Sequence, residues 1–181
     1  GDEEAIPDIN LEFASNPTEL VNQILYTRAV KTTYELSLIR KASVIGARGH
    51  LAAKEGFEQN LSEFEIHIKF LEATGLNEHA LPYGNIVAQN DHASLLHYQH
   101  QERHVPEPIL SLLIDAGGSY KGYASDITRT YCARTEHEVL ETGVFKSLIL
   151  AITKLKDALI AEACDGTSFV DLQRLMHQTL A

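Results

Sequence analysis

The 181-residue chain has little positive charge, few cysteines and no long apolar run. Lys and Arg number 15 against 25 Asp and Glu, which gives a formal net charge of −10. Because this balance repels a phosphate backbone and no basic stripe offsets it, we expect no nucleic-acid partner. No apolar run approaches the ~20 residues of a membrane-spanning helix. The first ten residues, GDEEAIPDIN, do not resemble a signal peptide, so we expect no membrane partner and no secretion.

The two cysteines, Cys132 and Cys164, form no CxxC pattern. Their spacing therefore indicates neither a disulfide framework nor a zinc knuckle, and it favours a reducing compartment, the cytoplasm. The sequence also contains no GxGxxG or GxxxxGK[ST] phosphate-binding loop.

The remaining composition is that of a globular domain, with 44% apolar and 22% charged residues. Residues 168–181 (SFVDLQRLMHQTLA) form an amphipathic helical pattern that stops at Ala181 without Gly, Asn or Pro. Because the apolar pattern continues up to the last residues, we expect the chain to be a fragment of a longer protein.

Helical patterns occupy the first half of the chain and its last third. Asn16-Pro17 predicts a helix to about Val30, and three capping boxes predict further helix starts. These boxes are Thr32-x-x-Glu35, Ser62-x-x-Glu65 and Thr135-x-x-Glu138. Gly75 is expected to end the helix that follows Ser62, and Gly46 and Gly49 indicate close packing of a helix against its neighbours.

The middle of the chain has the two-residue period of strands. We expect strands over 84–88, 94–98, 109–115 and 127–131. Helices, then antiparallel strands, then helices predict an α+β fold.

The segment from Asp115 to Asp126 (DAGGSYKGYASD) predicts a hairpin. We expect Asp115 to pair with Asp126, with Tyr120 and Lys121 at the tip. Two carboxylates that close repel each other, and a divalent cation would remove the repulsion. Two alternatives remain open: both aspartates are turn residues, or Arg129 or Lys121 neutralises one of them.

Four histidines, His92, His97, His100 and His104, lie close together in the sequence. The charged context of His100 and His104 indicates solvated surface. His97 lies in an apolar run, where a satisfied core histidine is the more usual interpretation.

Three segments together resemble the catalytic domain of Xaa-Pro dipeptidases (prolidases). They are VKTTYEL (30–36), PYGNIVAQNDHASLLHY (82–98) and LLIDAGGSYKGYASDITRTY (112–131). These enzymes are pita-bread metallopeptidases, and aminopeptidase P is a close relative. The resemblance implies a partial pita-bread fold, with residues 1–16 as the tail of a preceding segment and 17–181 as the N-terminal part of the catalytic domain.

The resemblance also implies roles for particular residues. Asp115 would be a terminal ligand of one metal ion, and Asp126 would bridge two divalent ions, usually manganese. His97 would act near the substrate carbonyl, and Tyr83 and Leu96 would line the substrate pocket. The substrate would be an Xaa-Pro dipeptide, and the enzyme would be a homodimer.

The remaining metal ligands of the family, one His and two Glu, have no counterpart in this sequence. We therefore expect the full-length protein to be a peptidase and this 181-residue chain to be inactive. Cleavage of longer Xaa-Pro peptides, as by aminopeptidase P, and a non-catalytic binding module are the alternatives.

Overall fold

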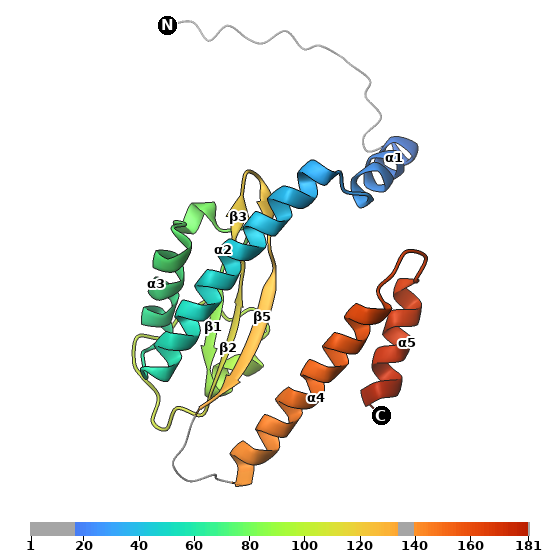
Figure 1. Cartoon of the computed structure of the whole chain (residues 1–181). Helices are drawn as coiled ribbons and strands as arrows, with labels where there is room; N and C mark the ends of the chain where they lie inside the picture. The colour runs from blue at the N-terminus through green and yellow to red at the C-terminus, as the bar shows by residue number, and fades with distance from the viewer. Residues whose placement is uncertain (1–16, 134–139, 181) are drawn as a thin grey trace, which may run out of the picture. The chain divides into compact units, whose positions relative to one another are not determined.

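The computed structural model describes residues 17–133 and 140–180 (Figure 1). The chain divides into two compact units, residues 1–37 and 38–181. The helices are α1 (Thr18–Ala29), α2 (Thr33–Glu58), α3 (Glu63–Thr74), α4 (Leu140–Glu162) and α5 (Phe169–Leu180). Two short 3₁₀ helices are η1 (Glu78–Ala80) and η2 (Asn90–Ser94). None of the helices within these described ranges is both long and apolar enough to cross a membrane.

The strands form two small antiparallel sheets. The first sheet has the order β1-β2-β5, from Ile86–Gln89, Ser111–Ala116 and Ile127–Cys132. The second is the hairpin β3-β4, from Ser119–Tyr120 and Tyr123–Ala124. This mixture of helices and antiparallel strands confirms the α+β class.

Local sequence signals set the helix ends as predicted. The side chain of Ser62 accepts a hydrogen bond from the backbone amide of Glu65, and the carboxylate of Glu65 accepts one from the backbone amide of Ser62. Thr32 and Glu35 make the same reciprocal pair. Gly75 ends α3 in the left-handed conformation, which glycine adopts without steric cost. The predicted box from Thr135 to Glu138 lies outside the described residues.

The main core lies between the helices α2 and α3 and one face of the three-stranded sheet (Figure 1). Its fully buried members are Ala53, Phe57, Ile66, Phe70, Val87, Leu112, Ile114 and Ala116. Side chains alternate along a strand, so Leu113 and Asp115 lie on the opposite face of β2. A second, smaller cluster covers that opposite face and consists of Ile86, Ala88 and Tyr98 with Ala93 and Leu113.

The structure corrects the prediction of a strand over 94–98. Residues 90–94 form η2 and a turn follows, with Leu96 82% exposed. The predicted strand 84–88 is shifted and becomes Ile86–Gln89. The apolar run Leu95-Leu96 misled the prediction, because only Tyr98 of this region turns inward and joins the second cluster.

The predicted hairpin register is also wrong, by two residues. Asp115 pairs with Thr128, not with Asp126, and Tyr120 pairs with Tyr123. The tip is therefore Lys121-Gly122, with φ angles of 48° and 81°. Positive φ at both central residues is the type I′ turn that suits the twist of a two-residue hairpin, and Gly122 adopts it readily.

Candidate metal centre

Asp115 and Asp126 lie on adjacent strand paths and on the same face. Asp115 is in β2 opposite Thr128 of β5, and Asp126 precedes Thr128 by two positions. Because alternate residues of an extended chain point the same way, Asp126 shares the face of Thr128 and hence of Asp115. The two carboxylates are diagonal neighbours, a relation that places positions roughly 7–8 Å apart.

Tyr83 links the two aspartates. Its hydroxyl donates a hydrogen bond of 2.9 Å to Oδ1 of Asp126 and also interacts with the carboxylate of Asp115. Burial, followed by these two carboxylates, raises the pKa of Tyr83 well above its ordinary value. The phenol therefore stays protonated near neutral pH and acts as a donor at this site.

The aspartates fit a divalent cation. Oδ1 of Asp115 is buried and has no hydrogen-bond partner in the part of the chain that the structure describes, although an unsatisfied buried oxygen is costly. Within the described ranges, neither cationic alternative from the sequence forms an ion pair with the aspartates: the guanidinium of Arg129 donates to the carbonyl of Thr128, and Lys121 lies over the ring of Tyr120. Hard divalent cations prefer carboxylate oxygens, so these two side chains are suitable ligands. Among the described residues, no group of three or more His, Cys, Asp or Glu forms a metal-binding cluster.

The side chain of Ser125 joins this edge of the sheet to α2. Oγ of Ser125 accepts from the amide of Gly118 at 2.9 Å and donates to the carbonyl of Ala42 in α2 at 3.1 Å. A Cβ at Gly46 would lie 2.5 Å from this same Oγ, so glycine permits the approach. Ser125 directly precedes Asp126, so its contact with α2 fixes the position of the backbone that carries the Asp126 carboxylate.

His50 supports the other aspartate through its neighbour. Its Nε2 lies 3.0 Å from the carbonyl of Ala116, the residue after Asp115. Because a carbonyl only accepts, Nε2 carries the hydrogen. Burial lowers the pKa of His50, so the ring is neutral near pH 7. The roles of Ser125 and His50 could not be predicted from the sequence, because Ala42 and Ala116, whose carbonyls they contact, are far away in the chain.

His97 and Leu96 are both exposed, on the turn that follows η2. The interpretation of His97 as a core histidine is therefore wrong. Its neighbour Tyr98 packs on the sheet face that carries Leu113, which is the face of Asp115. The segment with His97 thus covers the same side of the sheet as the aspartates.

The other histidines have different surroundings. His104 is exposed and pairs with Glu102 at 3.1 Å, as expected for the charged loop. Nδ1 of His92 lies 2.8 Å from the buried carboxylate of Glu63, a contact that the sequence did not predict. In the sequence, Glu63 has only the pattern of an acidic residue in the first turn of a helix.

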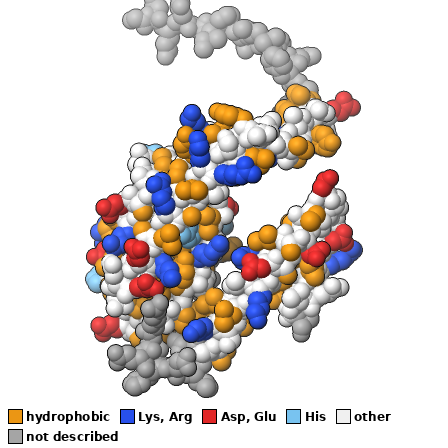
Figure 2. Space-filling view, in the orientation of Figure 1, with side chains coloured by type: hydrophobic (Ala, Val, Ile, Leu, Met, Phe, Trp, Pro, Cys, Tyr) orange, Lys and Arg blue, Asp and Glu red, His pale blue; other side chains and the backbone are white. Residues whose placement is uncertain are grey.

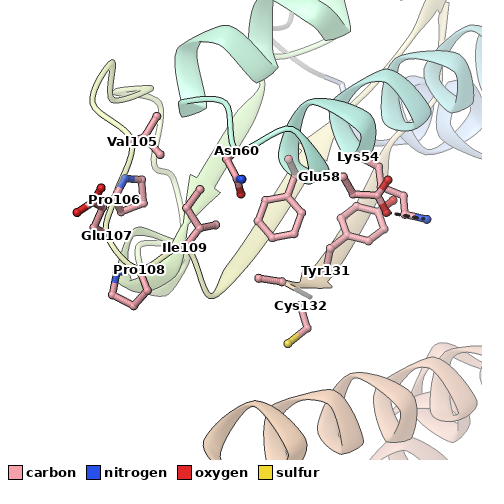
Figure 3. A pocket seen from close by; sticks show the side chains of 12 residues that line it. Lys54, Glu58, Asn60, Val105, Pro106, Glu107, Pro108, Ile109, Tyr131 and Cys132 are labelled. Carbon is pink, nitrogen blue, oxygen red and sulfur yellow. Dashed lines mark ion pairs between the residues drawn. The ribbon is translucent and has the colours of Figure 1, made fainter. Parts of the chain in front are cut away.

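A separate pocket of about 600 Å³ lies at the far end of β5 (Figure 3). Its lining includes Lys54 and Glu58, which form an ion pair of 3.9 Å, and Tyr131 beneath the Lys54 ammonium. Tyr131 is about 17 Å along the strand from Asp126 at ~3.4 Å per residue. None of the predicted site residues lines this pocket, so it is distinct from the candidate metal centre.

Comparison with known proteins agrees with the sequence resemblance. The chain is 48% identical over 172 residues to the Xaa-Pro dipeptidase of Shewanella loihica, a match that covers 94% of this chain and 38% of that protein. The corresponding enzyme of Proteus mirabilis is 43% identical over 96% of this chain and 37% of its own length. The chain thus spans little more than a third of these relatives.

The solved structures show the same fold. Aminopeptidase PepP of Pseudomonas aeruginosa matches with a TM-score of 0.74 and 25% identity, over 88% of this chain and 36% of that one. A substrate complex of Escherichia coli aminopeptidase P matches with a TM-score of 0.72 and 24% identity, over the same shares.

The fold defines the class: the chain is part of a metallopeptidase with the pita-bread fold. The sequence profile of metallopeptidase family M24 matches residues 37–181, and the chain belongs to that family.

Proposed function

We propose that the full-length protein hydrolyses Xaa-Pro dipeptides with the help of bound metal, and that residues 17–181 form the N-terminal part of its catalytic domain. The observation that carries the proposal is the convergence of Asp115 and Asp126 on the Tyr83 hydroxyl, with one Asp115 oxygen unpartnered. The relatives named Xaa-Pro dipeptidase support the choice of substrate.

In this proposal Asp115 and Asp126 hold two divalent ions together with ligands from beyond these 181 residues. When bound, such ions supply Lewis acidity at the peptide carbonyl. Tyr83 donates its hydrogen bond to Asp126 and orients that carboxylate. The imidazole of His97 donates a hydrogen bond to the oxyanion that develops at the carbonyl, and the exposed side chain of Leu96 lines the substrate pocket.

Several finer points belong to the same proposal. Manganese is the expected metal, because carboxylate-rich sites suit Mn²⁺. The full-length protein is expected to be a homodimer in the cytoplasm, and the absence of a CxxC motif supports a reducing compartment. Peptides rather than nucleic acids are the expected partners, because the chain carries a net charge of −10. Residues 1–16 are assigned to a preceding segment or linker.

Cleavage of longer Xaa-Pro peptides is the second candidate, and the likeness to solved aminopeptidase P structures favours considering it. The test compares Ala-Pro with Ala-Pro-Ala as substrates of the Mn²⁺-loaded full-length protein. We expect faster cleavage of the dipeptide, and a D126N variant should lose at least 100-fold in kcat/KM (about 2.7 kcal/mol). Equal or faster cleavage of the tripeptide would show that the protein acts as an aminopeptidase rather than as a dipeptidase.

A non-catalytic binding module is the remaining alternative. It predicts no turnover of either peptide and no His and two Glu in the part of the protein that follows these residues. Determining that downstream sequence therefore separates it from both enzymes.

A further inference from the structure

The carboxylate of Glu63 is one of the most completely buried charged groups in the described part of the chain, with 1% of the residue exposed. Glu63 is the first residue of α3. Burial of an ionised carboxylate is costly unless hydrogen bonds replace its hydration. The reason for its presence must therefore lie in what it binds.

Four donors fill the two oxygens of Glu63. Oε1 accepts from the amide of Gln89 at 2.7 Å and from Nδ1 of His92 at 2.8 Å. Oε2 accepts from the hydroxyl of Tyr98 at 2.6 Å and from the amide of Glu102 at 2.7 Å. All four donors belong to the stretch 89–102, which contains Leu96 and His97.

The donors are spaced so that they hold this stretch at both ends and in the middle. Gln89 is the last residue of β1 and Glu102 lies beyond the turn, while Tyr98 is adjacent to His97. The rings of His92 and Tyr98 stack at 4.6 Å, which joins the two side-chain donors to each other. Burial and then the bond to Glu63 raise the pKa of Tyr98, so its hydroxyl remains a donor near neutral pH.

Between its two ends, the stretch has few other fixed contacts. The ends are also held elsewhere: the side chain of Gln89 donates to the carbonyl of Leu61, and the carbonyl of Glu102 accepts from the amide of Phe64. Residues 91–101 form no strand, and their own described backbone bonds are short-range ones, from Leu95 to His92 and from Tyr98 to Leu95. Besides the bonds to Glu63, the described bonds from this middle part to the rest of the chain are those of Gln99 and Gln101 to the backbone of Gly84 and Asn85, at 3.2 and 3.4 Å. The bonds to Glu63 are shorter and charge-assisted, and such bonds are the stronger ones.

We propose that Glu63 is a positioning residue for His97: it fixes the segment 89–102 on the sheet face of Asp115, so that the imidazole reaches the substrate carbonyl. The inference rests on the proposed peptidase function. It deepens that function by assigning a role to a buried acid on α3 that touches neither substrate nor metal. A purely structural role for Glu63 would destabilise the fold without a specific link to His97.

The test uses the Mn²⁺-loaded full-length protein with the variants E63Q and E65Q. Glutamine keeps the size of Glu63, but its amide nitrogen cannot accept, so at least one oxygen's donors lose their partner. We expect E63Q to lower kcat for Ala-Pro at least 10-fold with KM changed less than 3-fold. Glu65 is the matched control, because it caps the same end of α3 through Ser62 and has no bond to the segment 89–102. E65Q should keep kcat within 2-fold.

A double-mutant cycle with H97A separates positioning from general destabilisation. If Glu63 acts through His97, E63Q should change kcat less than 2-fold once His97 is alanine. An equal loss in both backgrounds would overturn the inference. Y98F is the milder variant should E63Q fail to fold: it removes one donor and keeps the ring, and it should lower kcat in the same direction in the wild-type background only.

Amide hydrogen exchange supplies a readout that needs no activity. The amides of Gln89 and Glu102 donate to different oxygens of Glu63, so at least one of them should exchange at least 10-fold faster in E63Q, and neither should change in E65Q. Unchanged exchange of both amides in E63Q would overturn the inference that Glu63 fixes the segment 89–102. A wild-type protein without turnover would overturn the proposed function, whereas an active wild type with full activity in E63Q would overturn only the role of Glu63.

Discussion

At the scale of single residues, the Tyr83 hydroxyl is the group that contacts both Asp115 and Asp126. It donates to Asp126 and interacts with Asp115, and burial together with both carboxylates keeps its proton in place. In the metal-free chain this hydrogen bond to Asp126 lies beside a second acid, Asp115, and the two carboxylates repel each other. Removal of the hydrogen bond should therefore be felt most strongly when no cation is present.

We expect Y83F to lower the free energy of unfolding of the metal-free chain by about 1–2 kcal/mol, within the range of roughly 0.5–3 kcal/mol that hydrogen bonds to neutral and charged groups contribute. Urea unfolding in the presence of a chelator measures the change. Y34F is the control, because Tyr34 is 65% exposed and should tolerate loss of its hydroxyl. Equal unfolding midpoints for Y83F and the unmodified chain would show that the bond to Asp126 contributes nothing.

The pair of Glu102 and His104 gives a prediction on pH. Hydrogen bonds from the His104 side chain, then from the backbone of His104 and Arg103, lower the pKa of Glu102 from 4.5 to about 2. Since the folded-state pKa is depressed, the stabilisation is present above pH 4.5 and is lost as the pH falls toward 2. H104A should move the pKa of Glu102 back toward 4.5.

An NMR titration of the Glu102 carboxyl carbon measures this pKa. Glu65 is an internal reference in the same spectrum, because its pKa is lowered by hydrogen bonds from Ser62, which H104A leaves intact. A pKa of Glu102 that stays near 2 in H104A would assign the shift to the backbone amides alone.

At the scale of elements, the contact between α2 and the hairpin depends on the absence of side chains. A Cβ on Gly46 would lie 2.5 Å from Oγ of Ser125 and 3.2 Å from the amide nitrogen of Gly118. Both are parts of the sheet edge that carries Asp126. G46A should therefore push α2 away from this edge and lower the free energy of unfolding by about 1–3 kcal/mol.

The same substitution should have the opposite sign in α4. A Cβ at Gly143 would meet nothing within 4 Å, so G143A gains helix propensity of up to about 1 kcal/mol without a clash. Thermal unfolding of both variants decides the matter. A stabilised G46A would mean that α2 and the hairpin can separate without cost.

Sequence alone predicted those elements whose signals are local. The bonds of Ser62 with Glu65 and the left-handed Gly75 involve residues within one helical turn, so they could be identified from spacing. The prediction of the hairpin tip was wrong because it placed Tyr120 and Lys121 at the centre of the turn. Lys121 and Gly122 adopt positive φ and are the central residues. An error of two residues kept the faces right, since side chains alternate with a period of two.

The candidate site was predictable only in part, for the same physical reason. Asp115 and Asp126 flank one hairpin, so their common face follows from short-range pairing. The position of the segment with His97 depends on Tyr98 reaching Glu63, and that hydrogen bond joins residues far apart in the sequence. No periodicity within residues 94–98 carries this information, and the apolar pattern there favoured a strand that does not form.

At the scale of the whole molecule, the chain exposes side chains that usually lie in a core. Val144, Leu148 and Ile152, each more than half exposed, recur every fourth residue along α4. Figure 2 shows hydrophobic side chains on the surface of the molecule. Residues at this spacing form one stripe on a helix. The described residues thus bury one face of the sheet under α2 and α3, while much of the apolar surface of α4 stays in contact with water.

Like the apolar surface of α4, the metal centre of the 181-residue chain is incomplete. We expect the chain to bind Mn²⁺ weakly, with a dissociation constant of about 10⁻³ M or above, and to lack peptidase activity. Hard divalent cations take about six ligands, and sites with few protein oxygens retain their waters and bind poorly. Asp115 and Asp126 offer two carboxylates, one of which already accepts from Tyr83. Isothermal titration of Mn²⁺ into the chelator-treated chain, with D126N as control and an Ala-Pro assay in parallel, measures both properties. Two tightly bound ions per chain, or turnover equal to that of the full-length protein, would mean that other side chains complete the site.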